Sequence, residues 1–118
     1  FHEYAHALIY FLARGNNPPR WIHEGLAVHV ERRRAPEFRA QARAQARAGS
    51  VPSLDASPYI QGSAAVELLI ERHGMSAVQA LLRRLGEGQR FPEAFQESFQ
   101  TDLGTFQREL RESLIRGS

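Results

Sequence analysis

Five consecutive residues near the start of the chain, His2-Glu3-Tyr4-Ala5-His6, have the types and the spacing of a metal site. On a helix, positions four apart lie on one face about one turn apart, so the imidazoles of His2 and His6 would project together. Two neutral imidazoles in this arrangement chelate one zinc ion. Glu3 lies on the adjacent flank, where its carboxylate would take a proton from a water on the metal without being a ligand. The pattern therefore predicts two ligands and a general base.

A catalytic zinc ion takes three protein ligands and keeps one position for water, so a third ligand is expected further along the chain. Glu24 is the best candidate, because it lies in PPRWIHEGLAVHVE, where the spacing of apolar residues predicts a second helix. Asn17 is expected to cap this helix, with Pro18 or Pro19 in its first turn. The short Gly-Asn-Asn-Pro-Pro connection would let the second helix fold back on the first and bring Glu24 to both histidines.

With these residues in place, the chain resembles the gluzincins, the zinc metallopeptidases in which a glutamate on the next helix completes the HExxH site. The segment WIHEGLA is similar to the Trp-x-x-Glu-Gly-x-Ala signature of the aminopeptidase N family and of bacterial peptidase MA-like domains. In the aminopeptidases eighteen residues usually separate the second histidine from the glutamate, whereas seventeen separate His6 from Glu24. This departure favours the MA-like group.

A later segment, YIQGSAAVELL, resembles the Tyr-x-Lys-Gly-Ala stretch of the same aminopeptidases. There the tyrosine hydroxyl donates to the oxyanion of the tetrahedral intermediate, and Tyr59 is the matching residue. Gln61 stands where those enzymes have lysine, so the match is partial. The alternative for Tyr59 is an ordinary core position on an amphipathic helix.

The resemblance covers most of the chain and implies a peptidase that holds one zinc ion (Zn2+) and hydrolyses a peptide or protein substrate. His2, His6 and Glu24 would be the zinc ligands. Glu3 would act as general base, and Tyr59 would support the oxyanion. The alternative is a non-catalytic helical interaction module that has kept the zinc-site scaffold. A purely structural zinc needs no general base, so Glu3 favours the enzyme.

A further carboxylate, Glu31, lies seven residues after Glu24 and nearly on the same helix face. It is a candidate to accept the free ring N–H of a zinc-bound histidine. A salt bridge with Arg32 or Arg34 is the alternative. The remaining histidines, His23, His29 and His73, do not have the spacing of metal ligands. His23 is expected to face the substrate or the surface.

Helical patterns continue to the end of the chain, and no segment alternates with the period of a strand. Further helices are expected at 36–48, 58–73, 77–86, 92–99 and 103–114, with N-caps at Ser57, Ser76 and Asp102. The expected fold is mainly α, as a single helical domain over residues 1–118, with the zinc-site helices in 1–34 and a helical bundle in 35–118. In a gluzincin this would be the C-terminal part of a thermolysin-like catalytic domain. We expect the chain to be an excerpt whose upstream β-sheet part is absent and completes the substrate cleft.

All fifteen basic residues are arginine, and the formal net charge is +2. Arg39, Arg43 and Arg47 recur every four positions and would form one stripe along an Ala-rich helix. The expected role of the stripe is a solvated helix face, with an anionic substrate or a membrane surface as alternatives. A nucleic-acid partner is not expected, because aromatic residues that could stack on bases are not interleaved with the stripe.

Cysteine is absent, which excludes disulfides and thiolate ligands but leaves the compartment open. The longest apolar run, ALIYFLA, is too short to span a bilayer, so no transmembrane segment is expected in this chain. The resemblance to bacterial domains is compatible with an extracytoplasmic location, but the residues do not fix it.

Overall fold

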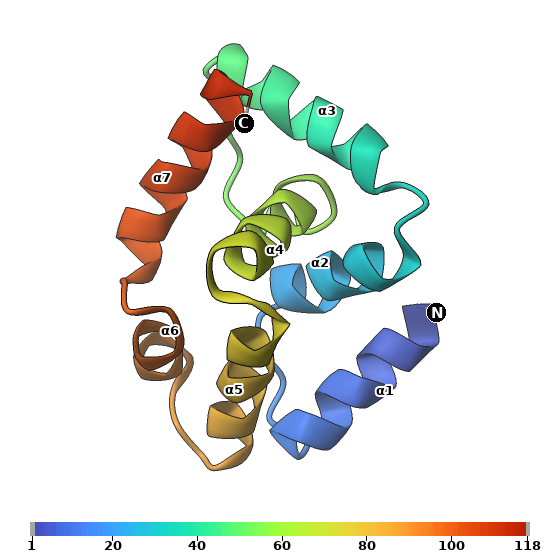
Figure 1. Ribbon diagram of the computed structural model, residues 1–118, viewed down its shortest axis with the longest axis vertical. Helices are drawn as coiled ribbons and strands as arrows, with labels where there is room; N and C mark the ends of the chain where they lie inside the picture. The colour runs from blue at the N-terminus through green and yellow to red at the C-terminus, as the bar shows by residue number, and fades with distance from the viewer. Residues whose placement is uncertain (1, 118) are drawn as a thin grey trace.

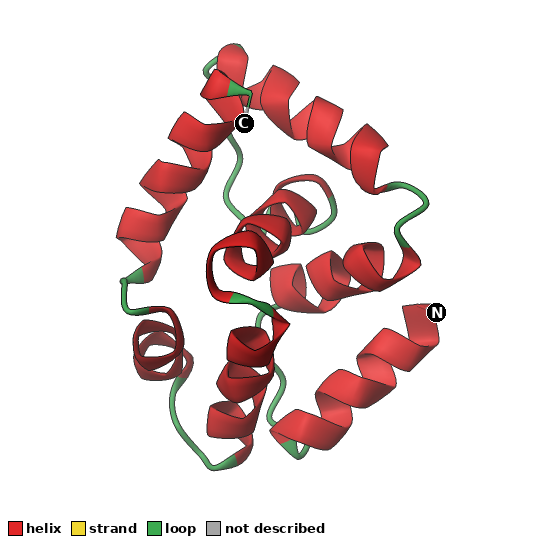
Figure 2. Ribbon diagram, in the orientation of Figure 1, coloured by secondary structure: helices red, strands yellow, loops and turns green. Residues whose placement is uncertain are grey.

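The computed structural model describes the backbone of residues 2–117 and the side chains of residues 5–117 (Figure 1). No strand occurs within the described backbone (Figure 2), which confirms the mainly α class. The helices are, in chain order, α1 (His2–Ala13), α2 (Arg20–Glu31), α3 (Ala35–Arg47), α4 (Ile60–His73), α5 (Met75–Gly86), α6 (Phe91–Phe99) and α7 (Leu103–Arg116). Their bounds lie close to those expected from the pattern of apolar residues, glycines and prolines.

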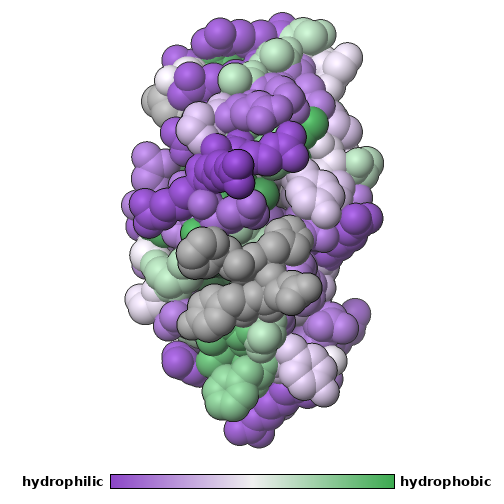
Figure 3. All heavy atoms as spheres, turned by 90° about the vertical axis from the view of Figure 1, so that its right-hand side faces the viewer, coloured by the Kyte–Doolittle hydropathy of each residue, from purple (hydrophilic) through white to green (hydrophobic). Residues whose placement is uncertain are grey.

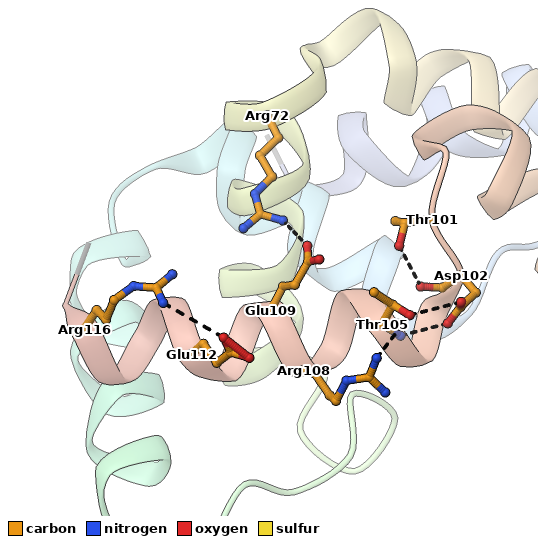
Figure 4. Close-up of polar contacts among 8 residues, drawn as sticks. All are labelled: Arg72, Thr101, Asp102, Thr105, Arg108, Glu109, Glu112 and Arg116. Atoms are coloured by element: carbon orange, nitrogen blue, oxygen red, sulfur yellow. Dashed lines mark hydrogen bonds and ion pairs between the residues drawn. The ribbon is translucent and has the colours of Figure 1, made fainter.

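Several helix ends follow from glycine, proline or a capping side chain, as expected. Gly15 follows α1 with a φ of 81°, and Gly74 ends α4 with a φ of 85°, a backbone region that glycine enters at little cost. Pro36 stands in the first turn of α3. At the start of α7, the Asp102 carboxylate accepts the backbone N–H of Thr105 at 2.8 Å (Figure 4), which confirms this N-cap.

Other predicted caps are wrong or weak. Asn17 does not cap α2, because Pro19 keeps an extended backbone (φ −54°, ψ 152°) and is itself the N-cap residue, without a side-chain hydrogen bond. Ser76 lies inside α5, since Gly74 reverses the chain and the helix begins directly after it. The Ser57 hydroxyl accepts the N–H of Gln61 at 3.4 Å, which is a weak form of the predicted cap.

Helix α4 lies in the middle of the molecule and contacts α2, α3, α5 and α7 (Figure 1). An ion pair between Arg72 and Glu109 joins α4 to α7 at the surface (Figure 4). The largest fully buried apolar side chains come from six helices: Ile9, Trp21, Ile22, Val66, Leu69, Val78, Leu81, Leu82, Phe95, Phe99 and Phe106. The apolar residues of the later helices therefore form much of the core. Among the described residues, no helix combines the length and the apolar character that crossing a membrane requires.

Two glycines allow α2 and α4 to cross at close range. A Cβ at Gly25 would lie 2.6 Å from the carbonyl oxygen of Gly62 and 2.5 Å from a methyl carbon of Val66. A Cβ at Gly62 would lie 2.9 Å from the carbonyl oxygen of Trp21. Both glycines belong to the segments WIHEGLA and YIQGS that resemble aminopeptidases. Their packing brings the start of α4 against α2.

The face of the molecule on the right-hand side of Figure 1 has one hydrophobic and one hydrophilic part (Figure 3). A hydrophobic patch lies low on this face, and the surface above it is mainly hydrophilic. On α1, the aromatic rings of Tyr10 and Phe11 are 65% and 76% exposed.

Candidate metal centre

One predicted ligand from each of the first two helices lies beside the other. The Nε2 atom of His6 on α1 lies 3.4 Å from Oε1 of Glu24 on α2. Glu24 is buried, and the His6 side chain is one-third exposed. Ligand atoms that each lie about 2.1 Å from a tetrahedral zinc ion are separated by about 3.4 Å. The donor types and their separation therefore fit two of the three predicted zinc ligands.

The other ring nitrogen of His6 faces a histidine that the ligand pattern did not select. Nδ1 of His6 lies 3.1 Å from Nδ1 of His23, and the two rings are tilted by 33° with centroids 5.2 Å apart. At this distance one nitrogen donates a proton and the other accepts it. If Nε2 of His6 binds a metal, its Nδ1 carries the proton, so His23 is the acceptor.

The electrostatics of His23 suit an acceptor. Burial lowers the pKa of the His23 imidazole, the neighbouring His6 lowers it further, and the Glu24 carboxylate opposes both. The neutral imidazole keeps one lone pair in the ring plane, which accepts the N–H of His6. His23 was expected at the substrate or the surface, and the structure instead places it against a predicted ligand. Its position depends on how α1 and α2 pack, which no spacing along the chain reveals.

Arg20 holds the predicted glutamate ligand from the other side and links it to the predicted tyrosine. Its Nε atom lies 3.6 Å from Oε2 of Glu24, and its guanidinium lies over the Tyr59 ring, 5.9 Å from the centroid. Tyr59 is itself 37% exposed and packs beside Phe38 with ring centroids 6.3 Å apart. Sequence reasoning did not select Arg20, although its i, i+4 spacing from Glu24 is a readable signal.

The structure describes the side chains of only some of the predicted site residues. The side chains of His2 and Glu3 lie outside the described residues, so their roles as ligand and general base stay predictions. Glu31 lines a hollow of about 140 Å³ together with Arg34 and Tyr59. The Glu31 carboxylate also helps to raise the pKa of the Arg34 guanidinium, after the larger effect of Glu37. Its proposed hydrogen bond to a ligand histidine remains a prediction.

Within residues 5–117, no group of three His, Asp or Glu side chains is arranged to hold a metal ion. The predicted trio needs His2, which lies outside that range.

A scan of protein-family models, a search of curated proteins and a search of solved structures found no match to this chain.

Proposed function

We propose that this chain carries the metal centre of a zinc-dependent peptidase of the gluzincin type, with His2, His6 and Glu24 as ligands. The observation that supports it most is the separation of 3.4 Å between Nε2 of His6 and Oε1 of Glu24. A direct charge-assisted hydrogen bond is shorter, about 2.7–2.9 Å. Such a bond occurs elsewhere in this molecule, between His29 and Glu67 at 2.7 Å. The longer separation suits two groups that share a cation.

A bound zinc ion would supply a water of lowered pKa and would polarise the scissile carbonyl. Glu3 would take the proton of the attacking water and pass it to the leaving nitrogen, which lets one carboxylate serve as base and then as acid. The hydroxyl of Tyr59 would donate to the developing oxyanion. Tyr59 is 37% exposed at the start of α4, which is compatible with contact between its side chain and a substrate.

Two further residues would hold the ligands in place. His23 would accept the Nδ1–H of His6 and so keep Nε2 free for the metal. Arg20 would orient the Glu24 carboxylate through its second oxygen, at 3.6 Å. The Arg20 guanidinium also stacks on Tyr59, so one side chain sets the position of a ligand and of the oxyanion donor.

The alternative function is a non-catalytic helical interaction module that retains the scaffold of a zinc site. The Arg20–Glu24 pair is compatible with this module, because the guanidinium balances the charge of the buried carboxylate without a metal. Measurements of zinc content and of peptide hydrolysis distinguish the peptidase from the interaction module.

The test is Glu3→Gln, which removes the base and keeps the size of the side chain. We expect this variant to bind as much zinc as the wild type while peptide hydrolysis falls by at least about 100-fold, the usual contribution of a general base. Glu93→Gln, at an exposed position of α6, is the matched control and should leave hydrolysis unchanged. Full hydrolysis in Glu3→Gln would contradict the mechanism. Zinc binding without hydrolysis, in a wild-type protein that includes the expected upstream β-sheet part, would favour the module.

A further inference from the structure

A second polar site lies on a different face of α2 from the candidate metal centre. It is a hollow of about 280 Å³ where the end of α2, the start of α3 and the middle of α4 meet. Its titratable lining residues are His29, Arg32, Arg39 and Glu67. His29 follows Glu24 by five positions, which turns its side chain by about 140° around the helix. The hollow is therefore separate from the predicted ligands.

One side of the hollow is formed by a hydrogen-bonded pair. Nδ1 of His29 lies 2.7 Å from Oε1 of Glu67, and the two side chains are 18% and 27% exposed. The short bond fixes the imidazole ring and occupies one carboxylate oxygen. Nε2 of His29 is left as the second polar atom of the ring.

Two arginines, Arg32 and Arg39, also line the hollow, and Arg32 is exposed. Arg39 is half-buried, and within the described part of the chain neither guanidinium takes part in a hydrogen bond or an ion pair. Two positive groups against the single negative charge of Glu67 leave the hollow positive. This balance disfavours a metal cation at His29 and favours an anion.

The backbone conformation of Arg32 decides which substitution can test its role. It ends α2 in the left-handed region with a φ of 64°, where glycine is the usual residue. A side chain in this region costs about 1–2 kcal/mol. Arg14 and Gln100 have similar positive φ values at other helix ends, so this conformation alone does not mark a binding site.

We propose that this hollow binds a compact oxyanion, such as a phosphate or carboxylate group, between the guanidinium groups of Arg32 and Arg39. The volume of about 280 Å³ lies at the small end of ligand pockets and suits one such group with its immediate substituents. Guanidinium groups match the paired oxygens of phosphate and carboxylate. The site does not depend on the proposed peptidase activity.

The test is a calorimetric titration of the metal-free protein at low ionic strength, with inorganic phosphate and separately with succinate. Metal-free protein is required because zinc itself would bind these anions. We expect saturable binding of one anion per chain, and the anion that binds more tightly identifies the source of the oxyanion group. Arg39→Ala should weaken binding by roughly tenfold or more. Arg32→Gly should do the same while relieving the backbone strain, so its effect would not reflect misfolding.

Two variants distinguish anion binding in this hollow from non-specific attraction by the positive charge of the protein. Arg47→Ala removes the same charge from the exposed end of α3, outside the hollow, and should change the affinity by less than about twofold. Glu67→Gln keeps a hydrogen-bond partner for His29, removes the opposing charge and should tighten binding. The proposal would be overturned by an absence of saturable binding, by equal losses in Arg39→Ala and Arg47→Ala, or by weaker binding in Glu67→Gln.

Discussion

At the scale of single residues, His6 uses both nitrogens of its ring. Nε2 faces the Glu24 carboxylate at 3.4 Å, and Nδ1 faces Nδ1 of His23 at 3.1 Å. The partner of the second nitrogen decides which nitrogen carries the proton and how the ring is oriented. The affinity of the centre for zinc should therefore depend on His23 as well as on the ligands.

We expect His23→Ala to lower the zinc affinity by about 10- to 100-fold, because His6 loses the acceptor that fixes its tautomer. Competition with a zinc-chelating dye measures this affinity. His23→Gln should restore part of it, since the amide oxygen also accepts an N–H. His73→Ala, at an exposed histidine of α4, is the control. An unchanged affinity in His23→Ala would rule out this role.

At the scale of helices, the close crossing of α2 and α4 sets how Tyr59, just before α4, lies relative to Glu24 on α2. Gly25 directly follows the predicted ligand Glu24, and Gly62 follows Tyr59 by three positions. Because neither glycine has room for a Cβ, the two helices approach more closely than ordinary side chains permit. The glycines of the two motifs thus have a packing role beside the chemical role that we propose for their neighbours.

Gly25→Ala should destabilise the protein by about 1–3 kcal/mol, because the added methyl group would overlap the Gly62 carbonyl and Val66. Urea unfolding followed by circular dichroism measures this change. Gly104→Ala is the matched control, since its Cβ would lie at an ordinary contact distance of 3.4 Å from an Asp102 oxygen. It should be neutral or stabilising by up to about 1 kcal/mol. Equal effects of the two substitutions would mean that the crossing has room for a side chain.

Helix α7 provides a pH-dependent prediction. The backbone N–H of Thr105 and then its hydroxyl lower the pKa of the Asp102 carboxyl below its usual value of 3.8. The ionised cap therefore stabilises the fold fully above that usual value, and the stabilisation is lost as the pH falls through the lower pKa of the folded state. Asp102→Ala should lower Tm by a few degrees at pH 7, and the difference should shrink below about pH 4. A difference in Tm that stays constant down to pH 2 would show that the charge of the cap is not involved.

At the scale of the whole molecule, the helices could be predicted from the sequence because each has an apolar stripe and most end at glycine or proline. The convergence of His6 and Glu24 could also be predicted, since a short connection between two helices allows few arrangements. The pairing of His6 with His23 could not be predicted, because it depends on the orientation of α1 about its axis relative to α2. The hollow lined by Arg32 and Arg39 could not be predicted either, because it lies between α2 and α3, which both pack against α4.

The most direct test of the metal centre is the zinc content of the purified protein by mass spectrometry. We predict about one zinc ion per chain in the wild type and a large loss in His6→Ala and in Glu24→Ala, because each removes one of the three proposed ligands. His29→Ala is the control, since this histidine of α2 pairs with Glu67 away from the centre, and it should retain zinc. A folded wild-type protein without zinc, or an equal zinc content in all these variants, would contradict the account.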